Sequence, residues 1–179
     1  VGINVQPREQ DQIMSDVRLL LNLQPKDFLV QPYFRFNSSV AKKIYDDSNS
    51  TYMVMLEPPG RRCLLYIVGT ERYLVGDNGF LKQVNLYLPE HEVRDQCLSS
   101  GILEGTLARE SEDSVRTQFY ITDVFLFDGD DVRNRPFDAR MGIIYQKIIR
   151  FRKEQQQKKY NMEQFEKDDL SITIRPYLR

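Results

Sequence analysis

The stretch that decides the fold is QFYITDVFLF-DGDD-VRNRPF, residues 118–137. Residues 118–127 alternate between apolar or β-branched and more polar positions, which predicts one long strand. The acidic run with Gly129 ends that strand in a turn. Pro136 suits the first turn of a helix, and the stretch therefore predicts a strand, a turn and a helix.

The predicted helix runs from Pro136 to Lys159. One apolar stripe of residues at helical spacing would face the sheet: Met141, Ile144, Ile148 and Phe151. The far end, Arg152 to Lys159, is polar on all sides and is interpreted as a solvated helix end. A second helix is expected over Glu9–Leu23, where Pro25 follows as a stop.

Further strands are expected on both sides of this stretch. Asp77-Asn78-Gly79 predicts a tight hairpin, because Asn and Gly tolerate positive φ. An edge strand or extended loop is expected over 28–36 and a turn over 46–50. The predicted strands are 51–56, 63–68, 73–75, 80–88, 102–109 and 170–174. Hairpin-joined strands that outnumber helices indicate an antiparallel-rich α+β domain rather than a doubly wound parallel sheet.

Composition narrows the possible functions. The chain has 179 residues, enough for a single domain over 1–179, and a formal net charge of -1. That charge argues against binding nucleic acid through bulk charge. Two cysteines and one histidine, His91, are too few for a disulfide framework, a zinc site or a histidine-based triad. The missing initiator Met leads us to expect a piece excised from a longer chain.

Five segments, in this order, resemble the nucleotidyltransferase core of eukaryotic mRNA guanylyltransferases. EPPGRR at 57–62 lies where that family has Lys-x-Asp-Gly-x-Arg. Residues 73–89 resemble the next family hairpin, and LEGTL at 103–107 resembles Leu-Asp-Gly-Glu-Leu. Residues 119–140 resemble the aromatic strand that ends in Asp-Val before a helix, and DDLSI at 168–172 resembles Asp-Gly-Leu-Ile-Phe. The resemblance implies a guanylyltransferase- or ligase-like core without the OB-fold domain.

The resemblance also implies that the chemistry is lost. In that family a lysine amine attacks the α-phosphate of GTP and holds GMP as a phosphoramidate. Here Glu57 stands at the lysine position, Pro59 replaces an aspartate, and Thr106 stands where the family has a metal-coordinating glutamate. A carboxylate cannot form the phosphoramidate and repels a triphosphate. We therefore expect no catalytic residue, no metal site and no cofactor in this domain.

The remaining motif positions are interpreted as structural or as weak ligand contacts. The degenerate motif positions are Glu57, Pro59, Gly60, Arg62, Glu104, Thr106 and Asp168. A nucleotide or phosphate contact is considered at Arg62 and Lys82. Gly60, Gly105 and the Asp123-Val124 strand are expected to shape the sheet.

The leading hypothesis is a non-catalytic guanylyltransferase-like module of an mRNA cap-processing protein. Nuclear cap 2′-O-ribose methyltransferases carry such a domain, which this chain resembles. The module would be a scaffold for protein partners in the capping or transcription apparatus, with capped RNA as a further candidate and no membrane. The location would be nuclear, with a cytoplasmic one as the alternative.

The runner-up is a snurportin-like module that binds a cap or nucleotide, and an active capping enzyme ranks third. The runner-up would stack guanine on an aromatic ring and hold phosphate with basic side chains. The available parts are Tyr66, Tyr73, Phe80, Arg61, Arg62 and Lys82.

Overall fold

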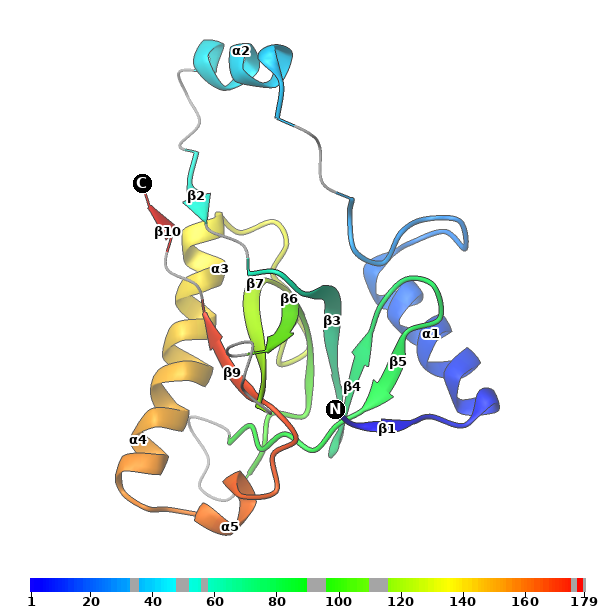
Figure 1. The fold of residues 1–179 in the computed structure, drawn as a ribbon, viewed down its shortest axis with the longest axis vertical. Helices are drawn as coiled ribbons and strands as arrows, with labels where there is room; N and C mark the ends of the chain where they lie inside the picture. Colours follow the sequence, from blue (N-terminus) through cyan, green and yellow to red (C-terminus); the bar gives the residue numbers. More distant parts are fainter. Residues whose placement is uncertain are drawn as a thin grey trace.

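The computed structural model describes residues 1–32, 36–47, 52–55, 58–89, 96–109, 116–174 and 177–178 (Figure 1). One eight-stranded sheet runs in the order β1-β5-β4-β3-β6-β7-β8, and β9 pairs with β7. Its strands are β1 (Ile3–Asn4), β3 (Arg61–Val68), β4 (Glu71–Val75), β5 (Leu81–Gln83), β6 (Ser100–Arg109), β7 (Thr117–Phe127), β8 (Asp130–Asp131) and β9 (Ser171–Ile174). A separate pair joins β2 (Val54–Met55) to β10 (Tyr177–Leu178).

The sheet confirms the predicted fold class. All its pairings are antiparallel except the parallel pairing of β7 with β9. The long strand predicted over 118–127 is β7, which lies between β6 on one side and β8 and β9 on the other. Among the described residues, no helix is long and apolar enough to cross a membrane.

The predicted hairpin turn lies between β4 and β5. Asn78 and Gly79 both have positive φ, at 60° and 72°. The Phe80 amide donates to the Asp77 carbonyl oxygen at 3.4 Å, which closes the turn. Two consecutive residues in this backbone region define the hairpin turn expected for Asn-Gly.

The predicted long helix is present but is not uniform. It consists of α3 (Phe137–Ile144), a π-helical segment η1 (Tyr145–Arg150) and α4 (Phe151–Gln157). A π-helical turn holds more residues than an α-helical turn, so the buried stripe shifts along the helix. Ile148 and Ile149 are both buried, and Arg152 is buried in the place expected for Phe151, which is only half-buried. The expectation of a solvated end is therefore wrong for Arg152.

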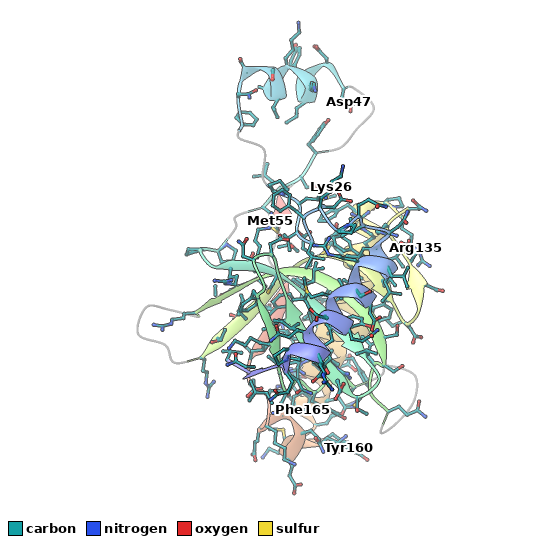
Figure 2. All side chains as sticks on the ribbon, turned by 90° about the vertical axis from the view of Figure 1, so that its right-hand side faces the viewer. Lys26, Asp47, Met55, Arg135, Tyr160 and Phe165 are labelled. Atoms are coloured by element: carbon teal, nitrogen blue, oxygen red, sulfur yellow. The ribbon has the colours of Figure 1, made fainter. Side chains whose placement is uncertain are left out.

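Helices cover both faces of the sheet. Ile144, Ile148 and Ile149 pack against odd-numbered residues of β3, and we call this side the α3 face. The first helix, α1 (Pro7–Leu21), packs Ile13, Val17 and Leu21 against the even-numbered residues of β3, which form the α1 face. Figure 2 shows α1 lying across that face.

The segment after β5 differs from its prediction. A strand was expected over 80–88, yet β5 ends at Gln83. The Asn85 and Tyr87 amides donate to the carboxylates of Asp169 and Asp168, at 2.7 and 2.6 Å. Because these side chains take up the backbone donors, the segment does not extend the sheet.

Two of the described helices were not predicted. Helix α2 (Ser38–Asp46) has no buried residue and stands apart from the sheet (Figures 1 and 2). The Asn37 side chain accepts a hydrogen bond from the Val40 amide at 3.0 Å and caps its N-terminus. α5 (Met162–Phe165) is a single turn that follows α4.

Candidate functional site

Three of the motif positions, on β3 and β6, lie side by side on the α1 face. Arg62 is in register with Thr106, and Leu64 is in register with Glu104. Residues in register point to the same face, and successive residues alternate between faces. Leu64 packs under α1, so Arg62, Glu104 and Thr106 share that face.

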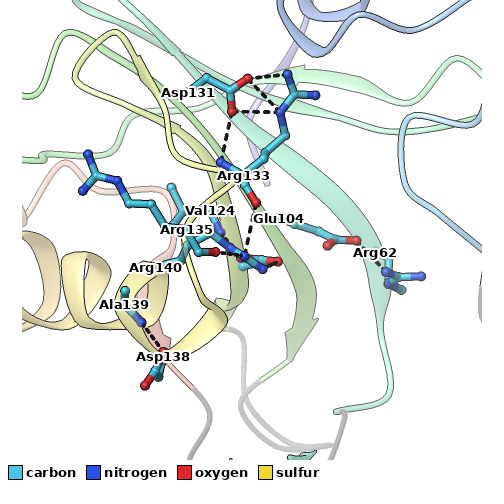
Figure 3. Close-up of polar contacts among 10 residues, drawn as sticks. Arg62, Glu104, Val124, Asp131, Arg133, Arg135, Asp138, Ala139 and Arg140 are labelled. Atoms are coloured by element: carbon cyan, nitrogen blue, oxygen red, sulfur yellow. Dashed lines mark hydrogen bonds and ion pairs between the residues drawn. The ribbon is translucent and has the colours of Figure 1, made fainter. Parts of the chain in front are cut away.

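Arg62 is held by internal partners. Its Nη2 lies 2.5 Å from Glu104 Oε1, and its Nη1 donates to the Gln31 carbonyl oxygen at 2.6 Å (Figure 3). The two side chains are 22% and 13% exposed, so this ion pair is largely shielded from water. A phosphate at this position would have to compete with the Glu104 carboxylate for the guanidinium.

Thr106 offers no carboxylate ligand for a metal ion, in contrast to the glutamate that the family has at this motif position. It is 1% exposed, and its hydroxyl carries no charge. Hard divalent cations in proteins are held mainly by carboxylate and carbonyl oxygens. Within the part of the chain that the structure describes, no group of three or more His, Cys, Asp or Glu could hold a metal ion.

Gly60 permits a close approach of two backbones. A Cβ atom there would lie 2.4 Å from the Leu107 carbonyl oxygen and 2.9 Å from Thr106 Cγ2. Any larger residue would push the start of β3 away from β6. Pro59, just before it, is exposed, and Glu57 lies outside the described residues.

Gly105, on β6, also occupies a position where a side chain would not fit. A Cβ atom there would lie 2.5 Å from both the Phe119 ring and the Tyr120 carbonyl oxygen. The Phe119 ring is fully buried and belongs to the core of the α3 face. Gly105 therefore makes room for this ring.

Two forked ion pairs fix the strand-turn-helix unit in place. Arg140 donates from Nε and Nη2 to the two oxygens of Asp123, each at 2.8 Å. Arg133 forms a similar forked ion pair with Asp131 through its Nε and Nη2 atoms. These hydrogen bonds lower the pKa of the Asp131 carboxyl to about 2. Arg133 Nη1 also donates to the Leu21 carbonyl oxygen at 2.8 Å, which ties the unit to α1.

Asp168 lies at a different place and contacts different partners. Its Oδ2 lies 2.8 Å from Arg152 Nη2, its Oδ1 accepts from the Tyr87 amide, and Arg152 also donates to the Tyr87 carbonyl oxygen. Both charged side chains are 9% exposed. Burial raises the pKa of the Asp168 carboxyl, although Arg152 acts to lower it. The last motif thus joins α4 to the segment after β5.

The structure does not bring Arg62 and Lys82 together. Lys82 is in register with Leu74, which faces α3, whereas Arg62 lies on the α1 face. The Lys82 ammonium donates to Asn4 Oδ1 at 2.5 Å. One phosphate cannot contact both cations across the sheet.

The aromatic side chains considered for a stacking site are buried or covered by other side chains. Tyr66 and Tyr73 are 5% and 1% exposed, and both pack in the core beneath α1. Phe80 is covered by Arg61, whose Cζ lies 4.5 Å from the ring centre. A guanine base could not reach either tyrosine ring without displacing α1.

Sequence reasoning missed two buried cations, Arg72 and Arg152. Arg72 is the second residue of β4 and Arg152 lies in a charged helix end, which are ordinary positions for exposed arginines. Their burial depends on strand register and on the π-helical segment, so no local pattern could reveal it.

Comparison with known proteins assigns the family. No curated protein matches the chain. The family model described as mRNA capping enzyme, catalytic domain, matches residues 4–178. That range includes the strand-turn-helix unit, both glycine contacts and the Arg62–Glu104 pair. The chain therefore belongs to the family of mRNA capping enzyme catalytic domains.

Proposed function

We propose that this domain is a non-catalytic guanylyltransferase-like module of an mRNA cap-processing protein and that it works through protein contacts. The observation that carries the proposal is the Arg62–Glu104 ion pair, which occupies the retained basic residue of the first motif. Glu57, Pro59 and Thr106 stand where covalent nucleotidyl transfer requires a lysine and two carboxylates. The parent protein would be a nuclear cap 2′-O-ribose methyltransferase, and the full-length reading frame tests that assignment.

The chemistry of the site supports this role. Phosphoramidate formation needs an amine nucleophile and a metal ion that offsets the charge of the triphosphate. Glu57 offers a carboxylate in place of the amine, and Thr106 offers a buried neutral hydroxyl. The features that persist, Gly60, Gly105 and the Asp123–Arg140 pair, all stabilise the fold.

We expect no covalent nucleotide adduct. The chain is incubated with labelled GTP or ATP and magnesium and is then run on a denaturing gel beside an active guanylyltransferase. Only the active enzyme is expected to carry label, because Glu57 cannot form a phosphoramidate. A labelled band from this chain, stable to base and labile to acid, would contradict the proposal. Glu57→Lys is not expected to restore transfer while Pro59 and Thr106 remain.

We also expect GTP and a methylated cap analogue to bind no tighter than about millimolar. A carboxylate about 4 Å from a phosphate repels it by roughly 4 kcal/mol at an effective dielectric near 20, or about a thousandfold in affinity. Glu57 supplies that charge, and the Glu104 carboxylate adds competition for Arg62. Calorimetric titration measures the dissociation constant.

Variants separate this outcome from the cap-binding alternative. Glu104→Gln removes the charge that holds Arg62 and is expected to strengthen any phosphate binding, as is Glu57→Lys. A micromolar dissociation constant for the unmodified chain that weakens on Arg62→Ala would favour a cap binder over a scaffold.

A further inference from the structure

Positive charge is concentrated along the helix that ends in α4. Residues 145–160 contain six Lys or Arg and one Glu, whereas the whole chain contains 25 Lys or Arg and 26 Asp or Glu. A chain that is nearly neutral overall therefore carries one strongly basic segment. Figure 1 shows α4 on the opposite side of the molecule from α1, so this segment lies away from the α1 face that holds Arg62.

Four of these cations are exposed, and we call them the basic stripe: Arg150, Lys153, Lys158 and Lys159. The Arg150 side chain is 58% exposed, and its Nε donates to Glu154 at 2.9 Å. The three lysines have no ion-pair partner within the part of the chain that the structure describes. Arg152 is not part of the stripe, because it is buried and paired with Asp168.

An exposed aromatic ring lies at each end of this segment. Tyr145 and Tyr160 are 45% and 39% exposed. All residues between them are described, and none of these is a large apolar residue with an exposed side chain. Gln156 and Gln157 are exposed beside the stripe and offer amide donors and acceptors. The surface thus combines cations, amides and two aromatic rings without an aliphatic anchor.

A strand of nucleic acid fits this surface better than an acidic protein segment does. Lysines that neutralise phosphates release condensed counterions, which gives affinity for nucleic acid without any apolar contact. An aromatic ring stacks on a nucleobase of any sequence. Ion pairs between exposed Lys and Asp or Glu contribute little by themselves. A protein partner would also need the buried apolar or aromatic anchors that carry most binding energy.

We infer that the basic stripe binds the phosphate backbone of single-stranded RNA, and that Tyr145 and Tyr160 stack on bases at its two ends. The exposed amide of Gln157 adds a partner for a ribose 2′-hydroxyl. The choice of RNA over DNA rests on the proposed function in cap processing, whereas the binding of a nucleic acid strand rests on charge and exposure alone. The inference adds an RNA contact to a module that otherwise works through proteins.

The test measures fluorescence anisotropy of a labelled, uncapped oligouridylate of about 12 nucleotides in a series of salt concentrations. The logarithm of the binding constant is expected to fall against the logarithm of the salt concentration with a slope of about -2 to -3, because each phosphate contact to a single strand contributes about -0.7. An oligothymidylate of the same length is expected to bind more weakly, and equal or tighter binding of that DNA would overturn the choice of RNA. The covalent adduct assay with GTP tests the proposed function separately, since the oligonucleotide carries no cap.

Paired lysine variants provide the matched control. Lys153→Gln combined with Lys158→Gln is expected to weaken RNA binding about tenfold and to make the slope shallower by about 1.4, because two phosphate contacts are lost. Lys42→Gln combined with Lys43→Gln removes the same charge from exposed positions on α2 and is expected to change neither.

A tyrosine variant and a competitor complete the test. Tyr145→Ala is expected to weaken binding about fivefold with an unchanged slope, because it removes a stack and no charge. Equal effects of the two lysine pairs, or a slope near zero, would overturn the inference. Displacement of the RNA by poly-L-glutamate as effectively as by unlabelled RNA would also overturn it and would favour an acidic protein.

Discussion

Ile148→Asp is expected to lower the free energy of unfolding by about 3–5 kcal/mol, because it buries an unpaired carboxylate in an apolar contact. Ile148 is 3% exposed and lies in the core of the α3 face beside Ile144 and Ile149. Denaturant unfolding followed by circular dichroism measures the change.

Tyr145→Asp is the control for this substitution. Tyr145 is in the same π-helical segment but is 45% exposed. The substitution is therefore expected to lower the free energy of unfolding by no more than about 1 kcal/mol. Equal stability of Ile148→Asp and the unmodified chain would show that this helix does not pack on the sheet.

Arg152→Ala is expected to lower the free energy of unfolding by about 3–5 kcal/mol, because it leaves the Asp168 carboxylate buried without its cation. Arg152 also donates to the Tyr87 carbonyl oxygen, and its Cζ lies 4.9 Å from the centre of the Phe165 ring. Arg150→Ala, two residues away, breaks an exposed pair with Glu154 and is expected to cost no more than about 0.5 kcal/mol. Thermal and urea unfolding of both variants test the contrast.

The decrease in the free energy of unfolding that Arg152→Ala causes is expected to become smaller as the pH falls. Burial raises the pKa of Asp168 even in the presence of Arg152, and removing that cation raises it further. A carboxyl with a raised folded pKa binds its proton more tightly when folded, so acid favours the folded variant through this group. Unfolding at about pH 7 and about pH 5 checks the sign, and a loss that grows toward about pH 5 would contradict it.

Local signals in the sequence were sufficient for some elements. The Asn78-Gly79 turn was predictable because its backbone conformation depends on those two residues. Helix α2 carried a readable signal that was overlooked, since Asn37 is a good N-cap and Val40 and Ile44 are spaced four residues apart. The shortening of β5 was not predictable, because Asp168 and Asp169, more than 80 residues away, take up the donors.

The candidate site was predictable by identity but not by geometry. Motif positions indicated Arg62, Glu104 and Thr106, yet only the register of β3 with β6 places them on one face. The register of β5 with β4 places Lys82 on the other face, which the sequence order conceals. The burial of Arg152 depends on the extra residues of the π-helical turn, which no periodicity revealed.

The π-helical segment constrains how the length of this helix can change during evolution. Each residue advances an α-helix by about 100° around its axis, so deleting one residue between Ile144 and Phe151 would rotate all of α4 by that angle. The rotation would turn Arg152 away from Asp168 while the helix itself remained regular. Insertions and deletions within 145–150 are therefore expected to be rarer than substitutions there, and a change in length would have to be matched by a change in the partner of Asp168.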